Sequence, residues 1–276
     1  MSSAKIAHRP AAARPAAARA RISAVTSGKG GVGKTFMSAN LAAALARRGE
    51  RVLVLDADLG MANLDVVLNL FPKVTLHDVF TGKCTLEEAL LPAPGGFDAL
   101  LAGSGLVEYS RLTFEVRDQL LDVIKTLSPR YDRILLDTGA GISDVVLYTA
   151  SLADDIIIVA TPEPTSLTDA YATIKVLAAQ QKRRLIHLIV NQSTRAGEGR
   201  VIRGQLQQVV DRYVTPTLMK DADGASESVK LVLIGEVPTD QNVRDAIQRR
   251  QLLIEMMPGS PSARAVQAIA EKMTPD

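Results

Sequence analysis

Nine consecutive residues near the start of the chain combine four glycines with two lysines and two hydroxyl groups: Ser27-Gly28-Lys29-Gly30-Gly31-Val32-Gly33-Lys34-Thr35. Glycines let the backbone bend so that successive N–H groups converge on one point, where a helix start adds its positive dipole end. A polyphosphate anion suits that point. We expect Lys34 to reach the β- and γ-phosphates and Thr35 to be a Mg²⁺ ligand. The G-x-x-x-x-G-K-T spacing therefore predicts a P-loop in which residues 28–35 bind a nucleotide.

Carboxylates follow two further apolar runs. Residues 51–55 form a predicted strand that delivers Asp56-Ala57-Asp58, and residues 133–136 form another that closes in Asp137. Doubly wound sheets bind ligands outside the carboxyl ends of their strands, so we expect these carboxylates to lie near the P-loop. One carboxylate of such a pair can serve a hydrated metal while the other serves an attacking water. Asp137 has the position of a Walker B aspartate, which bonds to metal-bound water.

The rest of the pattern indicates the scaffold that positions these groups. Strand-like runs alternate with helix-like runs, which is typical of a mostly parallel, doubly wound α/β sheet covered on both faces. Ser166, with Asp169 three residues on, is the predicted start signal of one helix. Phe114 belongs to the apolar face predicted to be buried in another. Strands are predicted at 22–27, 51–55, 98–101, 133–136, 155–161, 185–190 and 231–237, and helices at 34–48, 114–127, 166–179, 201–213 and 242–250.

Composition bounds the organisation of the chain. The 276 residues are 47% apolar, which predicts one domain at 21–276. Residues 1–20 form a basic Ala/Arg/Pro tail, with no acidic residue before Glu50, and we expect it to be disordered. Such a tail either attaches electrostatically to anionic lipid or DNA or is simply solvated. The single Cys84, with no apolar run long enough for a membrane span, predicts a cytoplasmic protein.

An additional lysine within the glycine run, Lys29, makes the loop resemble that of a known family. The form Lys29-Gly30-Gly31-Val32-Gly33-Lys34-Thr35 resembles the deviant Walker A box of the MinD/ParA family of ATPases. That resemblance implies ATP and Mg²⁺ as cofactors and a slow hydrolysis that resets an ATP-sandwiched homodimer. It implies that Lys29 crosses the dimer interface to the partner's nucleotide. Phe36 departs from the box, because a second hydroxyl residue is common there, and Gly139 stands where Pro or Ala is common.

The same resemblance implies roles for residues outside the loop. Asp56 would be the metal-side carboxylate, and Asp58 would position the attacking water. The metal ligands are then Thr35, Asp56 and Asp137. Asn191, at the end of a predicted strand, is similar to the asparagine that reads adenine in that family. The alternative is that Asn191 is an ordinary turn residue. The segment Pro238-Thr239-Asp240 resembles the base pocket, so that Pro238 and Asp240 would also bind the nucleotide.

Three phrases are most similar to the flagellar-number regulator branch, FlhG/FleN: residues 56–63, 137–143 and 161–171. That branch implies regulation of the number or placement of polar flagella. It also implies an FlhF-like GTPase or a flagellar transcriptional regulator as partner, and peripheral contact with the inner face of the membrane or the cell pole. The apolar stripe at 261–273 is thin for a membrane helix. The alternatives are a ParA-type ATPase of plasmid segregation, which binds nonspecific DNA, and a MinD-type regulator of the division site.

Overall fold

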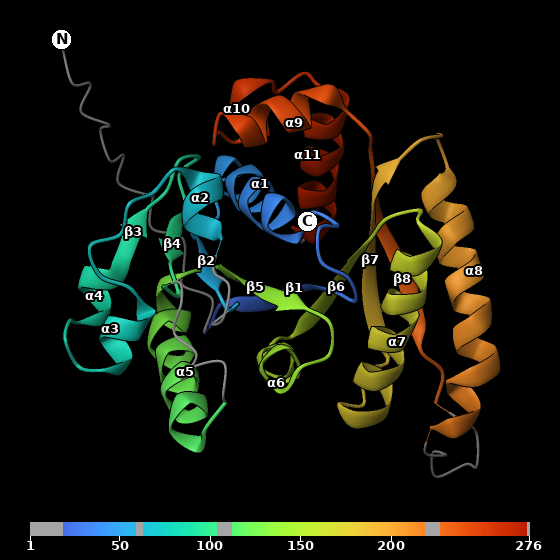
Figure 1. Cartoon of the computed structure of the whole chain (residues 1–276), viewed down its shortest axis with the longest axis horizontal. Helices are drawn as coiled ribbons and strands as arrows, with labels where there is room; N and C mark the ends of the chain where they lie inside the picture. The colour runs from blue at the N-terminus through green and yellow to red at the C-terminus, as the bar shows by residue number, and fades with distance from the viewer. Residues whose placement is uncertain (1–18, 59–62, 104–111, 219–226, 275–276) are drawn as a thin grey trace.

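The computed structural model describes residues 19–58, 63–103, 112–218 and 227–274 (Figure 1). Most of the predicted tail and residues 59–62 lie outside this part of the chain. Its eight strands form one sheet in the order β3-β4-β2-β5-β1-β6-β7-β8, and every pairing is parallel except that of β3 with β4. The strands are β1 Arg21–Ser27, β2 Val52–Asp56, β3 Leu90–Pro92, β4 Asp98–Leu100, β5 Arg133–Ala140, β6 Asp155–Ala160, β7 Leu185–Ser193 and β8 Lys230–Pro238.

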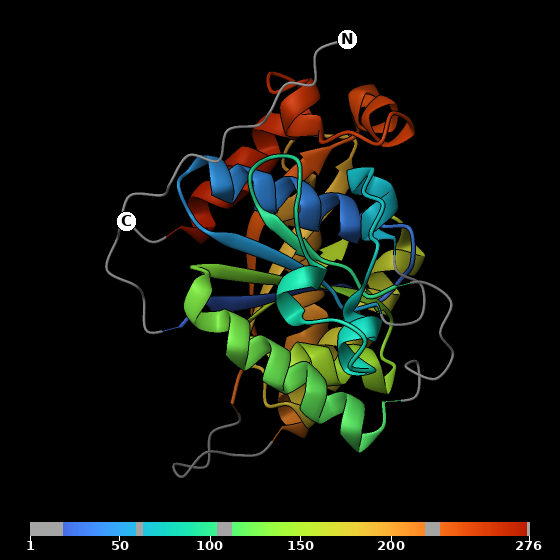
Figure 2. The same ribbon diagram turned by 90° about the vertical axis from the view of Figure 1, so that its left-hand side faces the viewer.

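Helices cover both faces of the sheet, so the predicted doubly wound α/β class is confirmed. Figure 2 shows α1 above the strands and α5 below them. One face carries α1 (Lys34–Arg47), α2 (Leu64–Leu68), α9 (Gln241–Gln248), α10 (Leu253–Met256) and α11 (Pro261–Met273). The other carries α3 (Leu76–Phe80), α4 (Leu86–Ala89), α5 (Phe114–Leu127), α6 (Asp144–Ser151), α7 (Pro164–Gln180) and α8 (Glu198–Tyr213).

Strand β1 has apolar side chains on both faces of the sheet. Ile22 and Ala24 pack into one core and Val25 into the other, because successive side chains of a strand point to opposite faces. The neighbours of β1 are β5 and β6, and β5 separates it from β2. The loop after β1 therefore emerges in the middle of the carboxyl edge of the sheet, beside the ends of β2 and β5.

Two local predictions are wrong. Helix α7 begins at Pro164, with Glu163 at the N-cap position, so Ser166 lies inside it. A proline fits the first helical position because its φ is already helical and its missing N–H is not needed there. The Ser166 hydroxyl instead accepts a hydrogen bond from the N–H of Thr161 at 3.0 Å. Phe114 is 81% exposed at the first residue of α5, although Leu120, Val123, Ile124 and Leu127 of the predicted apolar face are buried.

The apolar stripe of α11 belongs to the core. Ala263, Val266, Ile269 and Ala270 are all buried, and α11 packs on β8 and α1. A Cβ atom on Gly235 of β8 would lie 2.1 Å from Cγ1 of Ile269, so the two elements are in close contact. This face of α11 is consequently not available for the membrane docking that the resemblance implied. Among the described residues, no helix combines the length and apolarity that a membrane span needs.

Candidate functional site

The predicted P-loop joins β1 to α1 as a tight turn. Gly31 has φ of 77° and Gly33 has φ of 97°, which are left-handed conformations that favour glycine. Gly33 occupies the N-cap position of α1, and within the described residues no side chain caps that helix. The first N–H groups of α1 are therefore available to a ligand, next to the positive end of the helix dipole.

Close packing from two other elements shapes the same loop. A Cβ atom on Gly28 would lie 2.1 Å from the carbonyl carbon of Asp169 in α7, and one on Gly33 would lie 2.5 Å from Nδ2 of Asn191. Asn191 is buried at the end of β7 and donates a hydrogen bond from Nδ2 to the carbonyl of Val32 at 2.8 Å. Asn191 thus fixes the loop by a hydrogen bond to its backbone. Its contact with adenine stays a prediction.

Asp56 and Asp137 are neighbours on the parallel strands β2 and β5. Both are buried. Burial and the nearby Asp137 raise the pKa of Asp56 well above its ordinary value, although the backbone N–H groups of Asp58 and Leu64 donate to it at 3.1 and 3.3 Å. Two buried carboxylates side by side are an unfavourable arrangement that a bound metal ion would relieve.

The first two turns of α1 converge on Asp137. The Ser38 hydroxyl donates to Oδ1 of Asp137 at 2.8 Å, and the Thr35 hydroxyl lowers the pKa of the same carboxylate. Burial raises the pKa of Asp137 to about 6, against the lowering effect of these hydroxyl groups and of Lys34. Burial lowers the pKa of Lys34, while Asp137 and Asp58 oppose that shift. Lys34 is therefore the cation of an otherwise acidic, desolvated site.

Asp58 lies against the loop that follows Asp137. A Cβ atom on Gly139 would stand 3.3 Å from Cγ of the Asp58 carboxylate, which is closer than most real Cβ contacts. The glycine at this position, which departs from the family pattern, thus gives the Asp58 carboxylate room. The sequence signal for Asp58 was its spacing from Asp56, and the structure brings both to the carboxyl edge of the sheet with Asp137.

Lys29 contacts the start of α7. Its ammonium group donates to Oε2 of Glu163 at 2.7 Å and to Oγ1 of Thr165 at 3.0 Å, both at the start of α7. The Lys29 side chain is 38% exposed. The loop therefore has one lysine directed inward, Lys34, and one held at the surface.

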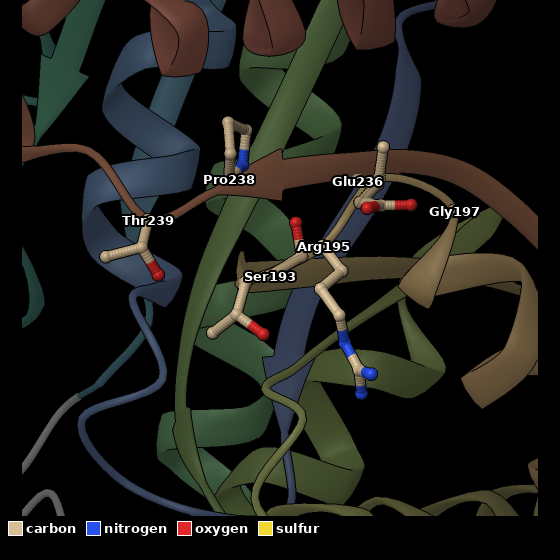
Figure 3. A pocket seen from close by; sticks show the side chains of 8 residues that line it. Ser193, Arg195, Gly197, Glu236, Pro238 and Thr239 are labelled. Carbon is tan, nitrogen blue, oxygen red and sulfur yellow. The ribbon is translucent and has the colours of Figure 1, made fainter.

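A surface pocket of about 560 Å³ opens beside the ends of β7 and β8 (Figure 3). It is lined by Ser193, Thr194, Arg195, Ala196, Gly197, Glu236, Pro238 and Thr239. Pro238 thus lines a pocket, and its contact with a base stays a prediction. Asp240 has another use: Oδ1 caps α9 by accepting the N–H of Asn242 at 2.9 Å, and Oδ2 accepts the N–H of Ser262 at 3.2 Å. Its base contact stays a prediction.

The donor set fits magnesium. Among the described residues, no cluster of three or more His, Cys, Asp and Glu side chains could hold a metal alone. Thr35, Asp56 and Asp137 instead supply one hydroxyl and two buried carboxylates, and Mg²⁺ binds through few protein oxygens while keeping water and substrate phosphates as ligands. The cradle and the carboxylates together suit a Mg²⁺–nucleoside polyphosphate.

Comparisons with known proteins agree with this geometry. A family model described as the CobQ/CobB/MinD/ParA nucleotide binding domain matches residues 23–254. The chain belongs to the MinD/ParA family. This MinD/ParA protein is 39% identical to the antiactivator FleN of Pseudomonas aeruginosa, over 92% of this chain and 86% of that one. It is 31% identical to the flagellum site-determining protein YlxH of Helicobacter pylori, over 90% of this chain and 79% of the relative.

A solved structure extends the likeness to the bound nucleotide. The septum site-determining protein MinD of Pyrococcus horikoshii, complexed with Mg-ADP, superposes with a TM-score of 0.71 at 29% identity, covering 92% of this chain and 96% of that one. The predicted family, ATPase activity and cofactors ATP and Mg²⁺ are confirmed. When bound, Mg²⁺ neutralises charge that develops on the transferred phosphoryl group.

Sequence reasoning missed the residues that support the site from other elements. Ser38 carried a signal, because it follows Thr35 by three residues and Lys34 by four, and so shares their face of α1. Asn40 also lies in α1, where Nδ2 donates to the carbonyl of Phe36 at 2.9 Å and Oδ1 accepts the N–H of Ile254 at 3.2 Å. It ties the start of α1 to α10. No sequence pattern indicated the contact of Gly28 with α7.

Proposed function

We propose that this ATPase is a switch that dimerises with ATP bound and regulates the number or placement of polar flagella. The observation that carries the proposal is its 39% identity, across almost the whole chain, to an antiactivator. A relative named for determining the flagellum site points to the same process. In this role hydrolysis resets the switch, so the rate of turnover sets how long a dimer persists.

Lys29 supports the dimeric part of the proposal. A phosphate cradle already contains Lys34, and Lys29 is directed outward with its ammonium group near the surface. A cation in that place is suited to the nucleotide of a second copy. In the same scheme Thr35, Asp56 and Asp137 hold the metal and its waters, and Asp58 orients the attacking water, because these groups share the carboxyl edge of the sheet.

The proposed partner is a flagellar transcriptional regulator, which the word antiactivator favours, or an FlhF-like GTPase. The proposed location is the cytoplasm, with contact at the cell pole made through that partner. This choice follows from the packing of α11, whose apolar stripe is buried against β8 and α1. A membrane contact through that stripe would require the helix to leave the core.

Lys29→Ala tests the dimeric switch. The variant should bind ATP as the wild type does but fail to form the ATP-dependent dimer, measured by light scattering with ATP and with ADP. Lys125→Ala is the matched control, because Lys125 is an exposed lysine on α5 whose charge is removed without touching the loop. A Lys29→Ala chain that dimerises and turns over ATP normally would contradict the role in trans.

Asp58→Ala separates assembly from hydrolysis. It removes the proposed water-orienting carboxylate and leaves the cradle intact, so the dimer should form with ATP and persist. Asp122→Ala, at an exposed carboxylate on α5, is the control and should return to monomer at the wild-type rate. Equal decay of the Asp58→Ala and wild-type dimers would refute this division of roles.

Deletion of the gene in its source organism tests the biological role. Flagella, division septa and inherited plasmids are counted in the same cells, and the strain is complemented with the wild-type chain or Lys29→Ala. We expect altered flagellar number that only the wild type restores. Normal flagella with plasmid loss would favour the ParA alternative, and minicells would favour the MinD alternative.

A further inference from the structure

Ser38 makes an unusual contact for a serine in the middle of a helix. A hydroxyl in that place commonly bonds to a carbonyl of its own helix, four residues back. The Ser38 side chain is instead fully buried and donates to Oδ1 of Asp137, on β5, at 2.8 Å. Thr35, one turn earlier in α1, also lowers the pKa of this carboxylate. The phosphate-binding helix is thereby tied to the strand that carries the Walker B aspartate.

We propose that Ser38 is a positioning residue for magnesium: by holding one oxygen of Asp137, it fixes the plane of the carboxylate that meets the hydrated ion. A carboxylate has two oxygens and about four lone-pair sites, so one hydrogen bond on Oδ1 leaves the remaining sites for a second partner. Residues that orient a metal ligand in this way are typically worth about 10- to 100-fold in metal affinity.

Asp56 provides the comparison that makes Ser38 stand out. The oxygens of Asp56 are held by the backbone N–H groups of Asp58 and Leu64, which truncation of a side chain to alanine does not remove. Asp137 depends on hydroxyl groups that α1 supplies. Thr35 is also a proposed metal ligand, so its hydroxyl would serve both the ion and Asp137. Ser38 is then the hydroxyl that remains dedicated to Asp137.

The test compares nucleotide affinity with and without the ion. A fluorescent ADP analogue is titrated into wild type and Ser38→Ala, in Mg²⁺ and in EDTA. We expect about equal affinities in EDTA and a gain on adding Mg²⁺ that is about 10-fold or more smaller in Ser38→Ala. Calorimetric titration of Mg²⁺ into the ADP complex should show the same weakening. Ser38→Thr, which keeps the hydroxyl, should restore most of the gain.

Ser23→Ala is the matched control. Ser23 is equally buried, on β1, and its hydroxyl has no hydrogen-bond partner among the described residues. The substitution deletes the same atom from the core without touching Asp137, so it should leave the Mg²⁺ gain unchanged. Thermal unfolding of all variants reports whether they fold. If Ser38→Ala does not fold, Ser38→Cys keeps the volume with a weaker donor and should lose part of the gain.

Two results would overturn the proposal. One is a Ser38→Ala chain with the wild-type Mg²⁺ gain. The other is a loss of affinity that is as large in EDTA as in Mg²⁺, which would mean that Ser38 only shapes the P-loop. If Mg²⁺ did not change the ADP affinity of the wild-type chain, the magnesium cofactor itself would be contradicted. The proposal for Ser38 concerns only this Mg²⁺ effect, so it does not depend on the flagellar role.

Discussion

The two ends of the parallel strands differ in how their charged side chains are paired. Where the strands begin, cations and carboxylates are matched: Arg133 pairs with Glu50 at 2.9 Å, and Arg51 with Asp132 at 2.8 Å. Where the strands end, the buried carboxylate Asp56 lies beside another, and each has a raised pKa. At the first edge each of these carboxylates has its own cation, whereas at the second the two carboxylates share one nearby cation, Lys34.

This difference separates stability from function. Like charges buried side by side cost free energy of folding, and such costs are concentrated where a ligand will later compensate them. A ligand that binds only the folded chain then stabilises it by mass action. The beginning of the sheet should therefore add to the free energy of unfolding, and the end of the sheet should lower it in the absence of nucleotide and Mg²⁺.

Lys34→Ala should have the largest effect at the ligand edge. It removes the inward cation of the cradle and leaves phosphate charge and Asp137 uncompensated, a loss on the order of 5 kcal/mol in binding free energy. We expect no measurable ATP affinity in a calorimetric titration. Arg51→Ala, at the other edge, is the control for loss of one cation. Undiminished affinity in Lys34→Ala would refute the P-loop assignment.

Glu50→Ala should have the largest effect at the opposite edge. The Arg133 and Glu50 side chains are only 3% and 8% exposed, and Arg133 also donates to the carbonyl of Met273 at the end of α11. Removing Glu50 leaves a buried guanidinium without its partner, which costs about 3–5 kcal/mol. Urea unfolding measures the loss, and the ATP affinity of the folded chain should not change. A loss below about 1 kcal/mol would mean that this pair is effectively solvated.

Asp137→Asn should stabilise the chain without nucleotide and Mg²⁺. The pKa of Asp137 is about 6 in the folded chain against an ordinary 3.8, so the folded state binds the proton more tightly. Its stability therefore falls as pH rises from about 4 to about 6 and stays lower above that. Removing the charge should raise the free energy of unfolding by about 3 kcal/mol at pH 8. Urea unfolding should show the advantage narrowing at pH 5, and an advantage independent of pH would contradict this cause.

The same contrast marks what could be predicted from sequence. The P-loop, Asp56, Asp58 and Asp137 were predictable, because each is a local motif or a strand end and parallel strands bring their ends to one edge. The strand at Leu90–Pro92 was not, since three residues are too few to show a period. Its antiparallel pairing with β4 was consequently missed.

Partners that are distant along the chain were also beyond sequence reasoning. Ser38 and Asp137 are 99 residues apart, and Lys29 and Glu163 are 134 apart. Spacing rules apply within one element, whereas these pairs depend on which strand lies beside which and on the rotation of α1 and α7 about their axes. Ser166 shows the converse: its local pattern was right for a helix start, but a proline two residues earlier began the helix first.

Arg51→Ala should have the smallest effect on the free energy of unfolding, and it gives the most direct comparison with Glu50→Ala. Arg51 follows Glu50 directly, lies at the same edge, and forms a two-pronged ion pair with Asp132. Its side chain is 39% exposed, however, so water competes with the pair, and the N–H of Arg51 still donates to Asp132 when the side chain is gone. Exposed pairs contribute about 0–1 kcal/mol, so urea unfolding of Arg51→Ala should show a loss well below that of Glu50→Ala.

Raising the salt concentration should reduce the small loss in Arg51→Ala further, because exposed charges are screened. Equal losses in the two adjacent variants would mean that burial does not distinguish the pairs, and that the matched edge acts as one network.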